Sequence, residues 1–394
     1  MRATTLTALL AATPLLVACT QNADSTSSGS SAGSSGGSDT AGTIRVTSTD
    51  DACDLSATRA PSGTVTFEVT NKGSSVTEFY LYAADGKRIL GEVENIGPQL
   101  SRELVVSAPA GRYVTACKPD MRGAGIRGDF TVTDSGAAVD PTAADSTQVD
   151  AAVDGYADFV RREAARLLAR TEAFAAAYTA GRDDRARALY PEARVPWERI
   201  EPVAESFGDL DPKMDARQAD LEQGQRWTGW HRIEKDLWPP ASGYAALTLA
   251  RRRAVATDLV ANTDKLQDRV QGLTLTVDQV ANGSRGLLEE VASGKVTGEE
   301  EIWSHTDLWD FQANVEGAEK AYGVLEPFVQ RKDPALARTL TGRFAALQHL
   351  LRQQRQGTGF RSYDQLSQAQ VRELANAVNA LAEPLSRLTG TVLG

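Results

Sequence analysis

Residues 229–234 place two groups that can bind a metal ion on one short segment. The sequence is Gly-Trp-His-Arg-Ile-Glu, so the imidazole of His231 lies three positions before the carboxylate of Glu234. The segment is predicted to be helical, and side chains three positions apart lie roughly 60° apart on one face of a helix. Such a pair suits iron or zinc better than a metal that prefers thiolates. Because the chain has only three histidines, this pair is the first candidate for a metal site.

Two clusters of carboxylates in the same half of the chain share the helical spacing. Glu198, Glu201 and Glu205 form one stripe, and Asp307 and Asp310 are three positions apart. Helical bundles build metal sites from inward carboxylates and His–carboxylate pairs on facing helices. Each cluster by itself is also typical of a solvated acidic face. Together with the His–Glu pair, and each beside a tryptophan, the clusters predict one shared site.

The region that must position these clusters has a helical pattern from Val149 to the C-terminus. Apolar residues recur at helical spacing, beginning with Tyr156, Phe159 and Val160. Glycines and prolines then separate further expected helices over 183–207, 215–237, 244–273, 276–293, 306–329, 334–356 and 368–388. Long amphipathic helices joined by short loops predict an all-α bundle over residues 150–394.

Residues 43–133 have the pattern of short strands. Apolar and polar residues alternate over 64–70, and further strands are expected at 78–82, 102–106, 111–117 and 128–132. Regular spacing with glycine-containing turns predicts a small antiparallel β-sandwich. Residues 134–149 are rich in small and polar residues and are expected to be a linker. The predicted fold class is therefore α+β, with an N-terminal sandwich followed by a helical bundle.

The N-terminus has the pattern of an export signal. An apolar stretch from Leu6 to Val17 is too short to span a bilayer, and small residues precede Cys19. This pattern predicts a bacterial lipoprotein signal over residues 1–19 with lipidation at Cys19; an ordinary secretory signal is the alternative. Residues 20–42 are almost entirely small and polar and predict a flexible tether. We expect a soluble body anchored by lipid to the extracytoplasmic side of a membrane.

Charge and cysteine content restrict the partners and the compartment. A net charge of −10 argues against nucleic acid and fits a protein that collects cations. If the signal uses Cys19, Cys53 and Cys117 remain, both in the predicted sandwich. In an oxidising compartment two such cysteines most often form a disulfide, and a metal–thiolate site is the alternative.

Three segments resemble a known family. They are residues 197–211, which begin Trp-Glu-Arg-Ile-Glu-Pro, the Gly-x-His-x-x-Glu motif over 229–234, and residues 305–314, which begin His-Thr-Asp-Leu-Trp-Asp. Together they resemble the imelysin-like domain of EfeO/EfeM proteins, the extracytoplasmic iron-binding components of the Efe iron-uptake system. The sandwich resembles the cupredoxin-like domain of the EfeO form.

The resemblance implies a protein that captures iron for an EfeU-type permease, with an EfeB-type haem peroxidase as a companion. The family motif assigns His231 and Glu234 to the metal site. Glu198, Glu201 and Asp310 are our predictions for the remaining ligands, with Asp307 and Glu205 in reserve. Ferric iron prefers hard oxygen donors, which this set supplies, but ferrous iron and zinc would accept the same ligands.

The resemblance also implies a second metal site in the sandwich. Cys53, Glu78 and Cys117 match the candidate ligands of that site, for which copper is proposed in the family. The sandwich contains no histidine, whereas a blue-copper centre needs two. A disulfide between the two cysteines would remove both thiolates.

Three alternative functions are considered. Imelysin-like proteins have been linked to proteolysis, but zinc peptidases need a second histidine beside the motif, and Lys235 follows Glu234 here. Copper in the sandwich would favour a ferroxidase. A surface interaction module would leave the carboxylate stripes as solvated faces. His349 lies on an apolar helical segment without a carboxylate at ligand spacing and is expected to be structural.

Overall fold

The computed structural model describes residues 43–86, 89–121, 123–136, 143–221, 224–293 and 295–393. The predicted lipoprotein signal with Cys19, the tether over 20–42 and part of the linker lie outside these residues. All of the described residues belong to one compact unit. Among the described helices, none is both long enough and apolar enough to cross a membrane.

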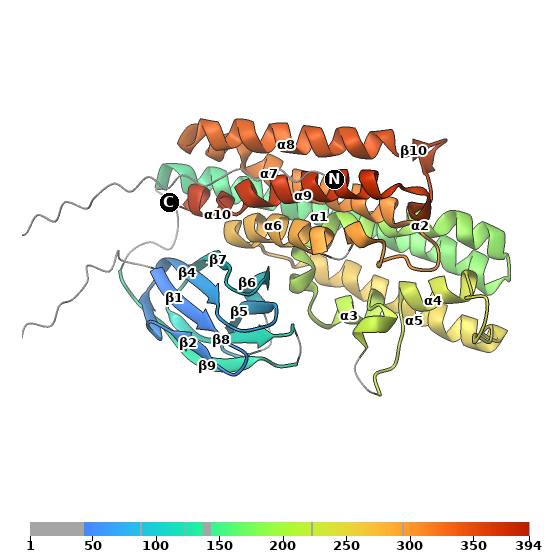
Figure 1. The fold of residues 1–394 in the computed structure, drawn as a ribbon, viewed down its shortest axis with the longest axis horizontal. Helices are drawn as coiled ribbons and strands as arrows, with labels where there is room; N and C mark the ends of the chain where they lie inside the picture. Colours follow the sequence, from blue (N-terminus) through green and yellow to red (C-terminus); the bar gives the residue numbers. More distant parts are fainter. Residues whose placement is uncertain are drawn as a thin grey trace, which may run out of the picture. The chain divides into compact units, whose positions relative to one another are not determined.

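The strand-rich region consists of two sheets, which confirms the predicted sandwich (Figure 1). The first has the strand order β2 (Cys53–Leu55), β1 (Thr43–Ser48), β4 (Gly63–Asn71) and β7 (Ser101–Ala108). The second has the order β3 (Arg59–Pro61), β9 (Ile126–Thr133), β8 (Gly111–Pro119), β5 (Thr77–Ala83) and β6 (Ile89–Ile96). The sheets are not wholly antiparallel as predicted, because β1 pairs with β4 and β3 with β9 in parallel.

The inward residues of both sheets form one core. The Phe67 ring on β4 lies 5.1 Å from that of Phe79 on β5 and 5.2 Å from that of Phe130 on β9, measured between centroids. These contacts join the two sheets, because β4 belongs to one and β5 and β9 to the other. Apolar residues at every second position thus fix which face of each strand is buried.

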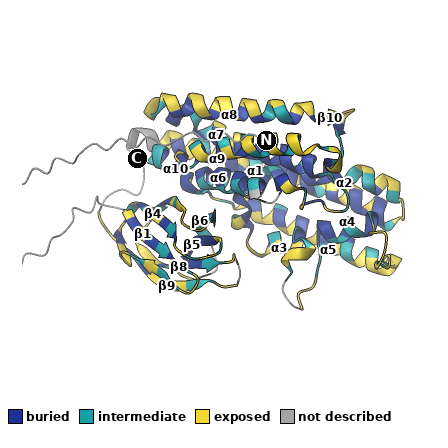
Figure 2. Ribbon diagram, in the orientation of Figure 1, coloured by how far each residue is buried: buried dark blue, intermediate teal, exposed yellow. Residues whose placement is uncertain are grey.

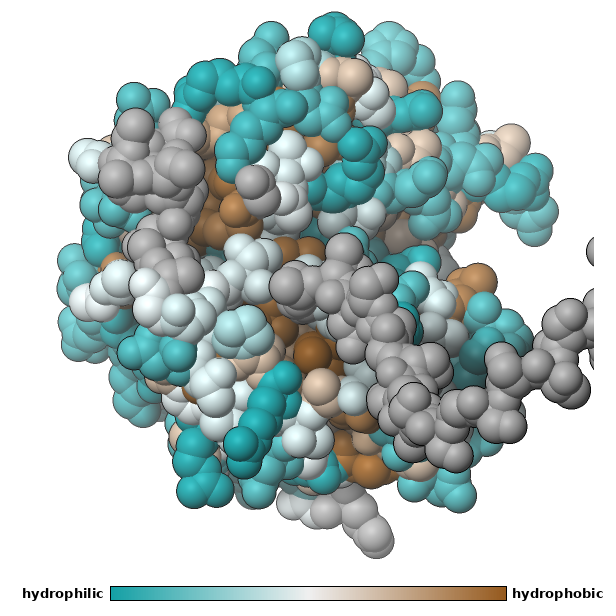
Figure 3. All heavy atoms as spheres, turned by 90° about the vertical axis from the view of Figure 1, so that its left-hand side faces the viewer, coloured by the Kyte–Doolittle hydropathy of each residue, from teal (hydrophilic) through white to brown (hydrophobic). Residues whose placement is uncertain are grey.

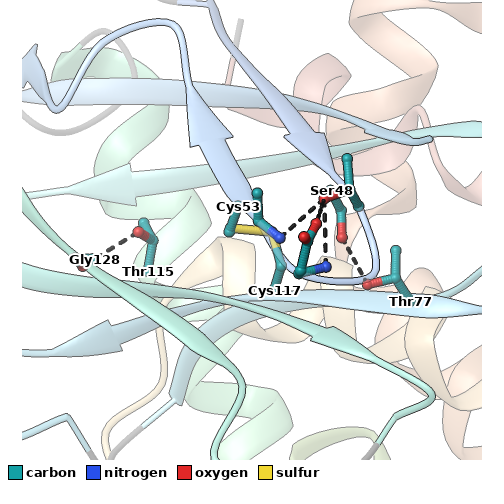
Figure 4. The surroundings of a disulfide bond; sticks show 9 residues. Ser48, Cys53, Thr77, Thr115, Cys117 and Gly128 are labelled. Carbon is teal, nitrogen blue, oxygen red and sulfur yellow. Dashed lines mark hydrogen bonds between the residues drawn. A yellow bond between two sulfur atoms is a disulfide. The ribbon is translucent and has the colours of Figure 1, made fainter. Parts of the chain in front are cut away.

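A disulfide between Cys53 and Cys117 joins β2 of the first sheet to β8 of the second (Figure 4). Nearby, the hydroxyl oxygens of Ser48 and Thr77 lie 2.9 Å apart and also link the sheets. The preferred interpretation of the cysteine pair is therefore confirmed, and the crosslink closes a loop with a sequence separation of 64 residues.

The rest of the chain is helical, as predicted. The helices are α1 (Ala143–Thr179), α2 (Asp183–Ile200), η1 (Glu201–Leu210), α3 (Asp211–Met214), η2 (Gln218–Asp220), α4 (Trp230–Leu237), α5 (Leu249–Gln271), α6 (Val277–Ser293), η3 (Lys295–Thr297), α7 (Asp307–Lys332), α8 (Pro334–Gln353), η4 (Tyr363–Gln365), α9 (Gln368–Leu385) and α10 (Leu388–Leu393). A short hairpin of β10 (Arg355–Gln356) and β11 (Gly359–Phe360) precedes η4. Helix α1 packs against α2 and α5, and α7 packs against α2, α6 and α8.

The helix expected over 244–273 is somewhat shorter, at Leu249–Gln271, and two others end or begin well inside their predicted ranges. The helix expected over 183–207 ends at Ile200, and η1 then contains Gly208 with φ 64° and ψ −120°. The helix expected over 215–237 begins only at Trp230, because Gly229 has φ 86° and an added Cβ there would lie 2.1 Å from the carbonyl oxygen of Met214. Glycine alone tolerates this combination of backbone angle and close approach. The irregular stretch before Trp230 carries part of the candidate site.

The helices bury one side and expose the other, as α8 illustrates in Figure 2. Figure 3 shows one face of the molecule, where hydrophilic side chains dominate the outline and hydrophobic ones are visible between them. Inside the bundle, α7 approaches α2 closely, since a Cβ on Gly317 would lie 2.3 Å from the carbonyl oxygen of Arg199. This close packing fixes the positions of the charged side chains that α2 and α7 contribute to the interior.

Replacing Cys53 and Cys117 by serine is expected to destabilise the sandwich by about 4 kcal/mol, because a loop of this length gains conformational freedom in the unfolded chain. Hydrogen exchange measured by mass spectrometry reports this locally. Faster exchange is expected over 43–133, and the helical residues serve as an internal control. Cys19 is replaced by serine in both proteins to prevent thiol exchange. Unchanged protection in the strands would contradict the expectation.

Candidate metal centre

Helix α4 carries the His–Glu pair into the interior of the bundle. The side chains of His231 and Glu234 are both 0% exposed. Nδ1 of His231 lies 3.3 Å from Oε2 of Glu234. The pair that the sequence singles out is therefore not a solvated surface pair.

Three further carboxylates converge on the same imidazole. Oδ1 of Asp215 and Oε1 of Glu300 lie 3.4 and 3.5 Å from Nε2 of His231. Oε1 of Glu301 lies 3.8 Å from Nδ1. None of these side chains is more than 7% exposed. All three come from residues outside the long helices, because Asp215 follows α3 and the two glutamates lie between η3 and α7.

The carboxylates form two groups, one at each nitrogen of the imidazole. Asp215 and Glu300 approach Nε2 of His231, whereas Glu234 and Glu301 approach Nδ1. Within each group the potential ligand atoms all lie within 4.8 Å of one another. The two nitrogens point away from each other, so the groups offer alternative positions for one ion.

The two sides of the imidazole differ in the hydrogen bonds that their atoms already make. The imidazole Nε2 is buried and makes no hydrogen bond to any described residue. Glu234, in contrast, contacts Nδ1 through Oε2, and its Oε1 accepts hydrogen bonds from the backbone N–H groups of Trp303 and Ser304 at 3.0 and 2.8 Å. The uncommitted nitrogen thus faces Asp215 and Glu300, and Glu234 holds the ring in place.

The guanidinium groups of Arg194 and Arg217 lie among these carboxylates, and Nη1 of Arg217 is 3.6 Å from Oε2 of Glu300. The side chain of Arg194 on α2 is 0% exposed, and Trp197 on the same helix donates a hydrogen bond of 2.7 Å from Nε1 to Oδ2 of Asp215. The Arg194 guanidinium forms ion pairs with Glu198, Asp215, Glu300, Glu301 and Asp310. Arg194 therefore links the residues around the imidazole to a second, neighbouring set of acids.

Lys295 neutralises that second set. Its Nζ lies 2.9 Å from Oε2 of Glu198 and 2.8 Å from Oε2 of Glu201, and its side chain is 1% exposed. The amide of Asn314 donates hydrogen bonds to both carboxylates, at 3.1 and 2.6 Å. Glu198 and Glu201 thus already have a cation and a hydrogen-bond donor of their own.

The segment that carries Glu300 and Glu301 is held in place by hydrogen bonds. The backbone N–H of Glu301 donates to Oδ1 of Asp307 at 3.0 Å. The carboxylate of Glu301 accepts hydrogen bonds from the hydroxyls of Tyr190 and Ser304, at 3.0 and 2.8 Å. These contacts position the two glutamates without a regular helix.

The five predicted ligands therefore fall into two sets. His231 and Glu234 lie together at the centre of the cluster. Glu198, Glu201 and Asp310 belong to the network of Lys295 and Arg194 beside it, rather than to the carboxylates that approach the imidazole.

The two further candidates, Asp307 and Glu205, lie outside both groups of potential ligands around the imidazole. Asp307 supports the backbone at Glu301, as described above. Glu205 lies at an exposed position on η1 and belongs to neither group of potential ligands. His349 is exposed on α8, away from both groups.

Asp215, Glu300 and Glu301 are the residues that the sequence analysis missed. Asp215 was expected at the start of a helix, where an acidic residue is unremarkable. Glu299, Glu300 and Glu301 form a visible acidic run in the printed sequence, immediately before Ile302. That run was the available signal. It lies in a stretch with no helical pattern, so the sequence could not predict which of its side chains point into the bundle.

Burial and unequal neutralisation perturb the acid–base properties of the cluster. Burial and the Arg194 guanidinium oppose protonation of His231, but the surrounding carboxylates outweigh both and raise its pKa well above the ordinary value. Burial opposes ionisation of Glu300, yet Lys295 and His231 lower its pKa to about 2. Burial and Glu234 raise the pKa of Glu301 well above its usual range. The cations of the cluster therefore favour the ionised form of Glu300, whereas Glu301 is favoured in its protonated form.

The predicted copper ligands of the sandwich are not brought together. The disulfide uses both sulfurs, so neither Cys53 nor Cys117 is a thiolate. In the pairing of β5 with β8, Phe79 lies opposite Cys117 and both face the core, whereas Glu78 lies opposite Lys118. Neighbouring positions on a strand point to opposite faces, so Glu78 lies on the other side of the sheet. The structure therefore does not form the predicted copper site of Cys53, Glu78 and Cys117.

Comparisons with known proteins agree with this architecture. The imelysin family model matches residues 152–388, and the cupredoxin-like domain model matches residues 8–132. The chain is 35% identical over 358 residues to the iron uptake system component EfeO of Yersinia pestis, covering 89% of this chain and 91% of that protein. The chain belongs to the EfeO family. The resemblance to this family, which three segments of the sequence indicated, is thus confirmed.

Two further comparisons extend this result. The iron uptake system component EfeO of Escherichia coli is 35% identical over 363 residues, with the same coverage of 89% and 91%. A crystal structure of a putative iron-regulated protein A precursor from Parabacteroides distasonis superposes with a TM-score of 0.52 at 19% identity, covering 66% of this chain and 97% of that one. At this identity the second likeness shows a shared fold alone.

The raised pKa of His231 predicts how stability depends on pH. A histidine with a higher pKa in the folded chain stabilises the fold fully below about pH 6.5, and this contribution is lost as the pH rises through the folded value. The free energy of unfolding of the metal-free protein should therefore decline above neutral pH, by at most about 1.4 kcal/mol per pH unit for this one proton. Denaturant unfolding from pH 6 to 9 measures it.

His231→Gln should remove this component of the decline, and His349→Gln, at the exposed position on α8, should retain it. Parallel curves for the wild-type protein and His231→Gln would show that His231 is not protonated in the folded metal-free protein.

Proposed function

We propose that the protein is the extracytoplasmic iron-binding component of an Efe-type uptake system, which captures iron and passes it to a membrane permease. One observation carries the proposal: a fully buried imidazole is surrounded by carboxylates from three separate parts of the bundle. The names of its EfeO relatives, which are iron uptake system components, support iron as the cargo.

The chemistry of the site suits a hard or borderline cation. Carboxylates of Asp215 and Glu300 together with Nε2 of His231 provide two oxygens and one nitrogen, the donor set that iron and zinc accept. Glu234 then acts through His231, because a carboxylate that accepts the other ring N–H fixes the tautomer and orientation of a metal-binding histidine. Water and Glu301 are available to complete the shell.

A binding role without catalysis fits the residues better than the peptidase alternative. Each of the two groups of potential ligands in the described residues contains one histidine, that of His231. Zinc peptidases of the His-Glu-x-x-His type use two histidines on one helix, with a glutamate as general base. Here Glu234 is held by backbone N–H groups and by the imidazole, which leaves it poorly placed to activate water.

The ferroxidase alternative requires copper in the sandwich, and the disulfide withdraws the two thiolates that would bind it. We therefore favour the helical cluster as the site of function. Anchoring through a lipid on Cys19 would hold this cluster near the membrane. An EfeU-type permease would then receive the iron, with an EfeB-type haem peroxidase as companion.

His231→Ala is expected to lower the affinity for ferric iron at least tenfold, because it removes the nitrogen ligand. The affinity is measured by competition with nitrilotriacetate, and zinc, titrated in parallel, reports divalent binding. His349→Ala is the matched control. Unchanged iron affinity in His231→Ala would contradict the proposed function.

The side of the imidazole that binds the ion is tested separately. Asp215→Asn and Glu300→Gln should each weaken iron binding at least tenfold, since each removes a charged ligand. Glu234→Gln should weaken it less, because it changes a group that orients the ring and does not remove a ligand. A larger loss in Glu234→Gln than in the other two variants would place the ion on the Nδ1 side instead.

A further inference from the structure

Arg194 and the imidazole of His231 share the same carboxylates. Asp215, Glu300 and Glu301 each lie within ion-pair distance of both groups. The guanidinium carries its charge at every accessible pH, and this one has no exposed surface through which it could turn to solvent. A cation at His231 must therefore use oxygens that the guanidinium already holds.

Two other acids contact Arg194 and offer it an alternative. Glu198 and Asp310 are both ion-paired with the guanidinium but belong to neither group of potential ligands around the imidazole. Oδ2 of Asp310 is buried and has no hydrogen-bond partner among the described residues, and Nε of Arg194 lies 3.4 Å from the other oxygen, Oδ1. The guanidinium can thus keep buried acidic partners while Asp215 and Glu300 turn to an ion.

We propose that Arg194 is a built-in competing cation, which neutralises the site before the ion arrives and sets how strongly the site prefers a trivalent over a divalent ion. This inference rests on the proposed function and deepens it by naming a residue that controls selectivity. Arg194 acts through the carboxylates it shares with the ion and is a positioning residue rather than a ligand.

The electrostatic consequence depends on the charge of the ion. The repulsion between a fixed positive charge and a bound ion is proportional to the charge of the ion, so Arg194 opposes a trivalent ion more than a divalent one. A purely structural role would change both affinities in the same direction and by similar factors. The ratio of the two affinities therefore separates the two roles.

The test uses the full chain with Arg194→Met, which removes the charge but keeps a long side chain, and Arg194→Lys, which keeps the charge. Arg199→Met is the matched control on the same helix, because Arg199 pairs with Glu163 and Glu316 outside the site. The probes are Ga³⁺, a trivalent ion that is not reduced, and Zn²⁺, each titrated against nitrilotriacetate.

Arg194→Met is expected to bind Ga³⁺ at least tenfold more tightly than the wild-type protein, with a smaller gain for Zn²⁺, so that the ratio rises. Arg194→Lys and Arg199→Met should keep a ratio within about threefold of the wild-type value. Weaker binding of both ions by Arg194→Met, or equal changes for both, would overturn the proposal and leave Arg194 a structural residue.

Folding and function are controlled for separately. Circular dichroism checks each variant without metal, and Arg194→Gln, which also lacks the charge, replaces Arg194→Met if that variant does not fold. If neither variant folds without metal, Arg194→Gln is refolded with each ion bound. The ratio of its Ga³⁺ and Zn²⁺ dissociation rates is then compared with the ratio for the wild-type protein. A wild-type protein that binds neither ion would refute the proposed function itself, whereas normal wild-type binding with an unchanged ratio in the variants refutes only the role of Arg194.

Discussion

The structure depends on the neutralisation of carboxylates buried in the bundle. Removing a charge from water costs several kcal/mol unless a partner compensates for it. Within the described cluster, the cations are Arg194, Lys295, the imidazole of His231 and, at the edge, Arg217, which pairs with Glu300. They face the carboxylates of Glu198, Glu201, Asp215, Glu234, Glu300, Glu301 and Asp310. The carboxyl groups outnumber the cations, so burial favours the protonated form of some of them, and a bound metal ion would supply the missing positive charge that the proposed function requires.

Long helices and irregular segments contribute different residues to the cluster. Helices α2 and α7 pack so closely at Gly317 that their interior side chains have fixed positions, which suits the cations and their permanent partners. The residues that approach the imidazole most directly lie outside the long helices, on short α4, after α3 and before α7. Gly229 makes this arrangement possible, because only glycine fits against the carbonyl of Met214 at a positive φ.

This division explains what the sequence could predict. Apolar periodicity identified the sandwich and most helices, and the three-residue spacing placed His231 and Glu234 on one helix face, since each depends on local spacing. Spacing also marked Glu198 and Asp310, which do point inward, and Arg194 lies four positions before Glu198 on the same helix. Spacing could not reveal that Arg194 also binds Asp310, 116 positions away, or that Lys295 binds Glu198 and Glu201, 97 and 94 positions away. Asp215 and Glu300 were missed because irregular segments carry no periodic signal.

The two cysteines of the sandwich are a second case in which the sequence left alternatives that only the structure distinguishes. A thiolate site and a disulfide need the same close approach of two sulfurs, so the sequence alone left both open. The pairing of β5 with β8 decides against the metal site independently of the redox state, because Glu78 lies on the face opposite Cys117. Reduction of the disulfide would restore two thiols within a hydrophobic core without adding a carboxylate to them. The proposed recognition of a hard cation therefore rests on the helical cluster.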